Sequence, residues 1–376
     1  MISNTKIYII IGFFIYMIFS AIIYITVSNI ITNRNNDKIN KLNKTYGKEV
    51  LRQLYLVKSG KELSKLDIEY IKEKLNKELY FRSFNNSIMK FNEDKKNHEY
   101  TTKYIEKFED IISKKIIKLS KRREDTFKIY NCYLISEYKI VNYEMSVSLT
   151  SYLKSNSMNL RIASLSAISQ IGKLDNFIKA IMYISDNDKY INNKVLLDIL
   201  DSFNGDIDLL DHEIMKLFNE FNDTIKKVII DHFTNNNTEF VKDEVLDILS
   251  NDLYNKEVRI STIKYFNKVK YEKSRDEIIR ILKNQDWEYR AICATTLGNY
   301  NTQITKQALL DSISDLNWYV RYNSAMSILK FNDARLIKRV FQADDRYSID
   351  ILLYAMSLKN KEYYERYIYM NEYRRA

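Results

Sequence analysis

The fold is decided by three copies of one pattern, which read NKEVRISTIKYF (255–266), DWEYRAICATTL (286–297) and NWYVRYNSAMSI (317–328). Arg259, Arg290 and Arg321 occupy the same place in each copy, at intervals of 31 residues. Apolar residues follow each arginine four, seven and ten positions later, which is the spacing of one face of an α-helix. Because similarity at a period of about 30 residues is typical of repeat proteins, the sequence predicts a stack of helical repeats.

The series of basic residues continues toward the N-terminus. Lys227, Lys194, Arg161 and Lys128 precede Arg259 at successive intervals of 32, 33, 33 and 33 residues. In most units a short polar turn and a second apolar stretch follow the first. Two amphipathic helices in so short a unit cannot bury their apolar faces alone, so neighbouring units must stack. We expect about seven repeats over residues 125–345 and capping helices over residues 346–376.

Two longer segments resemble a known kind of repeat. DWEYRAICATTLGNY (286–300) and RIASLSAISQIG (161–172) are similar to HEAT repeats of the short bacterial type first associated with phycobilin lyases. The resemblance covers roughly residues 125–345, although the middle units lack the small residues of the pattern. It implies an all-α fold, a right-handed α-α superhelix or HEAT solenoid, and it implies little about chemistry.

The composition agrees with an all-α fold. The chain has no proline and only six glycines among 376 residues, so long helices meet few residues that break them. It is rich in Ile, Lys, Asn and Tyr, which indicates an AT-rich, bacterial genome. Cys132 and Cys293 form no metal-binding spacing and are expected to be small buried residues in a reducing compartment.

Residues 7–33 contain no charged side chain. A helix of this length reaches about 40 Å, enough to cross a bilayer with some tilt. A cleaved signal peptide would have a shorter apolar stretch and a small-residue cleavage site. We therefore expect a retained transmembrane helix at the cell membrane.

Basic residues follow that helix closely, and the membrane-proximal ones are Arg34, Lys38, Lys41, Lys44, Lys48 and Arg52. Positively charged flanks stay on the cytoplasmic side, which places residues 1–6 outside as a short tail and the rest in the cytoplasm. Residues 34–128 hold 25 Lys+Arg against 15 Asp+Glu. The sequence predicts a basic helical neck over residues 34–124 that contacts anionic lipid head groups.

The last repeats contain the candidate protein-binding residues, which are Trp287, Tyr289, Arg290, Trp318, Tyr319, Arg321 and Tyr322. Aromatic residues and arginine are enriched at binding hot spots. Residues 256–346 hold 17 basic against 11 acidic residues, whereas residues 161–252 hold 9 against 17. A surface with one basic and one acidic half suits a protein partner of complementary charge. In the alternative interpretation, Tyr289 is a core residue and both tryptophans cover the seams between repeats.

The recurring Arg or Lys has a structural interpretation. Asp223, Asp286 and Asn317 precede Lys227, Arg290 and Arg321 by a few residues, which suggests helix caps and hydrogen bonds between repeats. A position that recurs in every repeat is what packing produces. We therefore expect these basic residues to hold the stack together.

No catalytic signal is present in the sequence. The sequence contains no GxxxxGK[ST], GxGxxG, GxSxG or HExxH motif, which leaves phosphate loops, nucleophile elbows and zincin sites without support. His212 and His232 have acidic neighbours, but their spacing is not that of a zinc helix, and solvated or capping roles are favoured. We expect no enzyme activity, cofactor, metal or small-molecule substrate.

These observations favour a membrane-anchored cytoplasmic scaffold or adaptor that binds a protein client, in an envelope-associated system. The alternative is a HEAT-like protein that binds nucleic acid, which would show salt-dependent DNA binding. A chromophore lyase is a third hypothesis that rests on the resemblance alone. The sequence does not identify the client.

Overall fold

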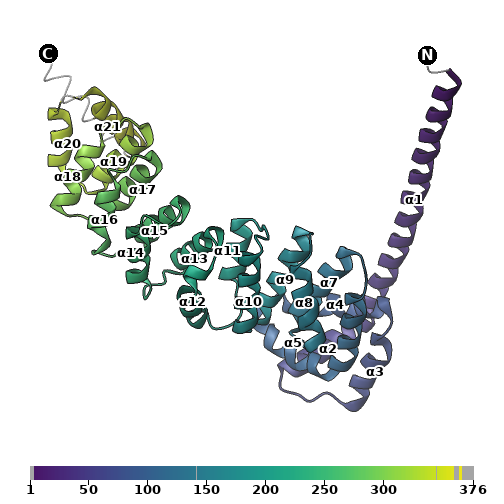
Figure 1. The fold of residues 1–376 in the computed structure, drawn as a ribbon. Coiled ribbons are helices and arrows are strands. Elements are labelled where there is room, and N and C mark those ends of the chain that lie inside the picture. Colours follow the sequence, from purple (N-terminus) through teal and green to yellow (C-terminus); the bar gives the residue numbers. More distant parts are fainter. Residues whose placement is uncertain (1–3, 141, 344, 360–363, 366–376) are drawn as a thin grey trace. The chain divides into compact units, whose positions relative to one another are not determined.

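The computed structural model describes residues 4–140, 142–343, 345–359 and 364–365, and over these residues it contains helices and no strand (Figure 1). The all-α solenoid predicted from the repeats is confirmed. Contacts between Cα atoms divide the chain into two units, residues 1–149 and 150–376. Each unit is described separately below.

The first unit is built around a long N-terminal helix. Its helices are α1 (Asn4–Lys44), α2 (Tyr46–Lys58), α3 (Lys65–Leu75), α4 (Glu78–Asn92), α5 (His98–Ile105), α6 (Glu109–Ser120), α7 (Asp125–Tyr138) and α8 (Tyr143–Leu153), the last of which crosses the boundary. Helix α1 therefore continues past residue 33, where the apolar stretch ends. Of the predicted tail over residues 1–6, residues 1–3 lie outside the described residues.

Helix α4 lies at the centre of this unit and contacts α1, α2, α3 and α5. Phe84 on α4 packs against Tyr104, Phe108 and Tyr138 from three other segments, at ring-centroid distances between 5.9 and 6.5 Å. On α1, Ile39 is buried, and Asn43 accepts a hydrogen bond of 2.7 Å from Ser83 on α4. The part of α1 beyond the apolar stretch is thus packed into the unit.

The second unit is a run of paired helices. They are α9 (Met158–Ile171), α10 (Leu174–Asp186), α11 (Asn193–Asp201), α12 (Ile207–Lys216), α13 (Asp223–Asn236), α14 (Lys242–Ser250), α15 (Lys256–Lys268), α16 (Ser274–Ile281), α17 (Trp287–Leu297), α18 (Gln303–Ser312), α19 (Trp318–Lys330), α20 (Ala334–Gln342) and α21 (Arg346–Lys359). Helix α21 covers the start of the predicted capping segment 346–376. Most of the rest of that segment lies outside the described residues.

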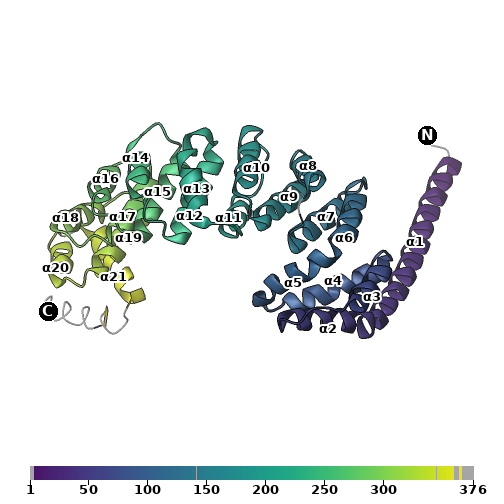
Figure 2. The ribbon, with the colours of Figure 1, turned by 90° about the horizontal axis from the view of Figure 1, so that it is seen from below.

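The paired helices form two layers. Each odd-numbered helix from α9 to α21 contacts the next odd-numbered one, and α14, α16, α18 and α20 form a similar series (Figures 1 and 2). The apolar residues four and seven positions after the arginines, such as Ile263, Leu297 and Ile328, are fully buried or nearly so. Stacking therefore buries the faces that a single pair would expose to water.

Polar caps start many of these helices. The side chains of Asn192, Asp206, Asn222, Asn255 and Asn317 each accept a backbone N–H of the helix that follows. Such caps satisfy donors that have no partner inside the helix. Asp223, which the sequence suggested as a cap, is instead the first residue within α13, and Asn222 caps that helix.

Candidate functional site

Five aromatic side chains form a continuous row across three consecutive odd-numbered helices. Trp287 on α17 stacks on Tyr319 of α19, with ring centroids 5.3 Å apart. Trp318 contacts Tyr319 edge-on at 5.2 Å and stacks on Tyr322 at 5.1 Å, with 5° between the ring planes. Tyr354 on α21 completes the row at about 6 Å from Trp318 and Tyr322. We call these five residues the aromatic row.

Four residues of the aromatic row are exposed to solvent, and Tyr322 is half-buried. Trp287, Trp318 and Tyr319 are 39%, 43% and 55% exposed. Tyr354 is similarly exposed and was not among the residues singled out from the sequence. It lies 32 residues after Tyr322, so the repeat period itself could have identified it. The helical stack thus brings together four of the predicted residues and one that was missed.

The other three predicted residues point elsewhere. Tyr289 is buried, like Val258 and Val320 at the equivalent positions. Arg290 forms a bidentate ion pair with Asp315, in which Nε and Nη2 donate to the carboxylate at 2.7 Å and 2.9 Å. Arg321 is bonded to the loop that precedes its own helix. Tyr289 therefore belongs to the core, and the two arginines hold the loops next to their helices.

Three of the four recurring arginines repeat one hydrogen-bond geometry. In each case Nη1 donates to the two backbone carbonyls five and six residues earlier: Arg161 to Ser155 and Asn156, Arg290 to Asn284 and Gln285, and Arg321 to Asp315 and Leu316, at 2.7 to 3.0 Å. Arg259 differs, because its Nε donates to Leu249 and its Nη2 pairs with Asp252. Arg161, Arg290 and Arg321 thus satisfy loop carbonyls, and Arg259 satisfies a carbonyl in the last turn of α14.

The membrane-proximal basic residues lie on two helices. Arg34, Lys38, Lys41 and Lys44 are on α1 and Lys48 is on α2, and all five side chains are exposed. Arg52 differs from them because it pairs with Glu49 on its own helix and with Asp67 on α3. Asp67 also forms the capping box of α3 with Ser64. Arg52 therefore joins two helices, whereas the other five carry charge on the surface.

His232 lies at a buried polar cluster and is not solvated, contrary to one interpretation of the sequence. Its ring contacts Asp201 through Nδ1 at 2.5 Å and Asp211 through Nε2 at 2.9 Å. Thr238 donates to the second oxygen of Asp211 at 2.7 Å. No group of three or more His, Cys, Asp and Glu side chains in the described part of the chain is arranged to hold a metal ion.

The two carboxylates stabilise a positive charge on this histidine. Burial lowers the pKa of His232, but the hydrogen bonds and negative charge of Asp201 and Asp211 outweigh burial and raise the pKa to about 9. The imidazolium is therefore the ordinary form at neutral pH. A protonated ring donates from both nitrogens and has no lone pair for a metal, so the cluster is a structural ion triad.

Both cysteines are buried and unpaired. Burial raises the pKa of the Cys132 thiol to about 12 and also raises the pKa of Cys293. A thiol of raised pKa is a poor nucleophile at neutral pH. The expectation that both are small buried residues agrees with this geometry.

Comparison with known proteins finds a match in the second unit. A family model described as HEAT repeats matches residues 242–329. This part of the chain is similar to HEAT repeats. It contains the helices from α14 to α18 and nearly all of α19, and so includes four residues of the aromatic row. A search of the curated proteins found no relative of the chain.

Solved structures that match the chain include three of different kinds. The complex of CpcE and CpcF of phycocyanin lyase from Nostoc sp. PCC7120 matches with 10% identity over 65% of this chain and 93% of that one, at a TM-score of 0.28. Kap121p matches with 11% identity over 88% of this chain and 48% of its own, at 0.39. Human deoxyhypusine hydroxylase in complex with glycerol matches with 11% identity over 78% and 95%, at 0.28. These chains share little sequence with this protein, and their activities say nothing about its own.

Proposed function

We propose that the protein is a membrane-anchored scaffold whose HEAT repeats bind a client protein in the cytoplasm through the aromatic row. The observation that carries the proposal is the row itself, in which two tryptophans and three tyrosines pack against one another and all but Tyr322 are exposed. Large aromatic side chains supply contact area with little loss of side-chain freedom, and they dominate binding hot spots. No catalytic activity or cofactor is part of this proposal.

The N-terminal helix supports the anchor. Helix α1 has a stretch that is long and apolar enough to cross a membrane, by length and composition. None of that stretch is buried within the protein, and side chains such as Phe14, Ile18 and Ile22 are exposed by more than half. Contiguous apolar surface of this extent is stabilised by lipid and not by water.

The flanking charges support the orientation. The exposed residues Arg34, Lys38 and Lys41 follow directly after the apolar stretch, whereas only Lys6 precedes it. Because basic flanks are retained in the cytoplasm, the repeats lie on the cytoplasmic side and residues 1–6 lie outside. An anchored repeat domain on that side suits an envelope-associated system.

Charge indicates the kind of client. The repeats that carry the aromatic row belong to the segment 256–346, in which basic residues outnumber acidic ones by 17 to 11. An acidic protein surface with an apolar centre would match both the charge and the rings. The client is therefore expected to be a protein with net negative charge at the contact.

The test compares client capture from membranes by the unmodified chain and by a Trp287→Ala, Trp318→Ala double variant. After crosslinking in cells and affinity capture, the variant should lose the partners that the unmodified chain recovers, because both stacks of the aromatic row are broken. Tyr190→Ala is the matched control, since Tyr190 is an exposed aromatic residue of the same unit outside the row. Identical partners for all three chains would exclude the aromatic row as the binding surface.

Nucleic acid is the alternative partner, and the exposed basic residues of α1 are the feature that would favour it. The full chain in detergent should show no DNA binding at low salt if the scaffold proposal is right. Binding that weakens steeply as salt is added would instead favour a nucleic-acid-binding protein.

A further inference from the structure

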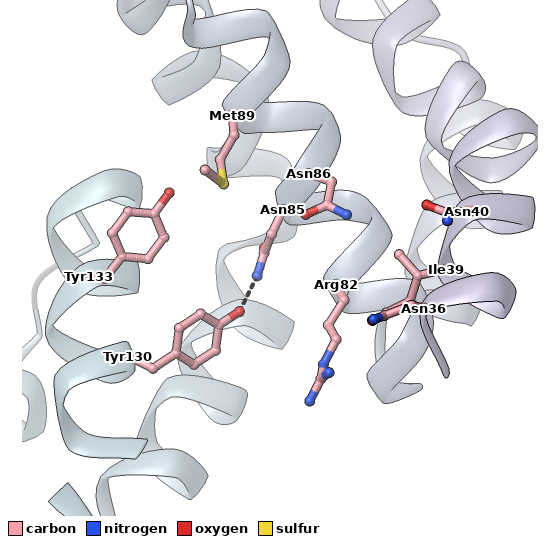
Figure 3. Close-up of a pocket in the computed structure, with 9 residues that line it drawn as sticks. All are labelled: Asn36, Ile39, Asn40, Arg82, Asn85, Asn86, Met89, Tyr130 and Tyr133. Atoms are coloured by element: carbon pink, nitrogen blue, oxygen red, sulfur yellow. Dashed lines mark hydrogen bonds between the residues drawn. The ribbon is translucent and has the colours of Figure 1, made fainter. Parts of the chain in front are cut away.

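A polar pocket lies beside α1 just past the end of its apolar stretch. It has a volume of about 500 Å³ and is formed by three helices of the first unit (Figure 3). The lining residues are Asn36, Ile39 and Asn40 of α1, Arg82, Asn85, Asn86 and Met89 of α4, and Tyr130 and Tyr133 of α7. Four carboxamides, a guanidinium and two phenols thus converge in one place.

The inner wall of the pocket is held by hydrogen bonds. Asn85 is buried, and its Nδ2 donates to the hydroxyl of Tyr130 at 2.6 Å, as Figure 3 shows. The hydroxyl of Tyr138 donates to the other end of the same amide. Tyr130 also stacks on Tyr133, with ring centroids 6.3 Å apart. This wall is already positioned before any ligand arrives, which lowers the cost of binding.

The outer part of the pocket has unused hydrogen-bonding groups. Within the described residues, the side chains of Asn36, Asn40 and Asn86 make no hydrogen bond, and all three are exposed. Arg82 pairs with Glu78 through Nε alone, at 3.2 Å. Its two terminal nitrogens keep four N–H donors, in the fork geometry that suits phosphate. Figure 3 shows Arg82 extending between Tyr130 and Asn36.

The depth of the pocket fits the surface of a bilayer. Asn36 and Asn40 follow the last residue of the apolar stretch, Asn33, by three and seven positions. At 1.5 Å per residue they lie about 5 to 10 Å beyond it along the helix. The head-group layer on each side of a bilayer is about 5 to 8 Å thick. The α1 side of the pocket therefore lies at or just beyond the lipid head groups.

Most of the basic residues of α1 point away from the pocket. Arg34, Lys38 and Lys41 recur at intervals of four and three residues and share one face. Asn36 and Asn40 lie on the opposite side of the helix at 100° per residue, whereas Lys44 lies about 40° from Asn40. The pocket is therefore lined by other residues than those of the basic surface, and none of them is a carboxylate that would favour a cation.

We propose that this pocket binds the head group of an anionic, hydroxyl-bearing phospholipid. Arg82 would bind the phosphate, the free amides of Asn36, Asn40 and Asn86 would bind the hydroxyls, and the ring of Tyr133 would cover the ligand. Amides both donate and accept, as hydroxyl recognition requires. The proposal rests on the membrane anchor proposed above. A lipid head group and a soluble polyol phosphate would offer this pocket the same chemistry, a phosphate joined to a polyol.

The experiment titrates the full chain in a neutral detergent with dihexanoyl phosphatidylglycerol and follows binding by calorimetry. Glycerol 3-phosphate and dihexanoyl phosphatidylcholine are titrated in parallel. We expect phosphatidylglycerol to bind at least tenfold more tightly than phosphatidylcholine. It should also bind more tightly than glycerol 3-phosphate, because both carry a phosphate joined to glycerol and only the lipid adds an acylated glycerol that can contact Ile39 and Met89. Tighter binding of glycerol 3-phosphate would overturn a lipid as the ligand.

Three variants separate this pocket from general attraction to charge. Asn40→Leu and Asn86→Leu leave the net charge unchanged and should each weaken phosphatidylglycerol binding about tenfold, since each removes hydrogen bonds to the head group. Arg82→Gln should weaken it further. Lys90→Gln is the control, because Lys90 is an exposed cation of α4 that does not line the pocket. Equal affinity of Asn40→Leu, Asn86→Leu and the unmodified chain would overturn the proposal.

The measurement of ligand binding does not require the membrane anchor. The ligands are soluble, so binding is measured whether or not α1 crosses a membrane, and membrane extraction of the same chain tests the anchor separately. Tight binding by a chain that extracts as a soluble protein would overturn the membrane anchor and leave the pocket. Absence of binding by a chain that stays in the membrane would overturn the pocket alone.

Discussion

At the scale of single residues, His232 couples folding to pH. Its pKa is raised to about 9 in the folded chain by Asp201 and Asp211, which outweigh the opposing effect of burial, whereas an unfolded histidine has a pKa of about 6.5. The folded state therefore holds the proton more tightly. The stabilisation is complete below pH 6.5 and is lost as pH rises toward 9.

We expect the free energy of unfolding to fall by roughly 3 kcal/mol between pH 6.5 and pH 9.5, as the pKa difference implies. Urea unfolding followed by circular dichroism at several pH values measures this. His232→Gln should be less stable at pH 6.5 and should lose most of this pH dependence. His212→Gln is the control, since His212 is exposed, and a variant of His232 with unchanged pH dependence would contradict the ion triad.

Arg290 is the second residue for which the structure gives a specific expectation. It bridges Asp315 and two loop carbonyls, and both charged side chains are mostly buried. Removing one partner of a buried pair leaves a charge without a counter-charge. The contact also joins two consecutive repeats.

Arg290→Met should therefore lower the free energy of unfolding by about 3 to 5 kcal/mol, measured by urea unfolding. Arg335→Met is the matched control. Arg335 pairs with Asp333 but is 87% exposed, and exposed pairs contribute less than about 1 kcal/mol. Equal losses in the two variants would show that the Arg290 contact is not buried in solution.

At the scale of elements, the repeats are joined by side chains that reach one period along the chain. Gln170 donates to the carbonyl of Ser202, Asn299 to that of Asn267 and Ser327 to that of Ala294, at separations of 32 to 33 residues. Hydrogen bonds of this separation fix the register of one helix pair on the next. They also explain why small and amide residues recur near the ends of the first helices.

Gly172 is the glycine on which such a junction depends. It ends α9 with a φ of 76°, and a Cβ there would lie 2.5 Å from the backbone oxygen of Asn204 in the next repeat. Gly60 has a similar φ of 73°, but a Cβ there would meet nothing within 4 Å. The two glycines thus share one backbone conformation and differ in their neighbours.

Gly172→Ala should lower the free energy of unfolding by about 2 to 4 kcal/mol, because the backbone strain adds to a clash between repeats. Gly60→Ala should cost only the strain, about 1 kcal/mol. Thermal or urea unfolding of the two variants gives the difference, which measures the close approach of Asn204. An equal loss of unfolding free energy in the two variants would indicate that the repeats move apart to accommodate the methyl group.

At the scale of the whole molecule, the long helix α1 combines two environments. Its first part presents apolar side chains on every side, whereas its last turns are packed against α4 through Ile39 and Asn43. A helix that is continuous across this change can carry a membrane span directly into a folded domain. In the proposed membrane anchor, this continuity would place the polar pocket close to the bilayer surface.

We expect the chain to remain in the membrane fraction after washing at pH 11. The double variant Ile18→Arg, Ile22→Arg should be released, because each arginine at the centre of a span costs about 2.5 to 3.5 kcal/mol. Ile304→Arg is the control, since Ile304 is an exposed apolar residue of α18, and it should behave like the unmodified chain. Release of the unmodified chain by the wash would exclude a transmembrane anchor.

The sequence by itself determined the all-helical solenoid and its period, because Arg161, Arg290 and Arg321 recur in register with helical apolar spacing and these patterns are local. It also determined the apolar stretch of residues 7–33. The repeat period also offered Tyr289 as a core residue and could have identified Tyr354. Tertiary structure alone showed that Trp287 stacks on Tyr319, and that His232 lies between two carboxylates. These outcomes depend on which side chains meet when helices far apart in the sequence stack, and the spacing along one helix does not contain that information.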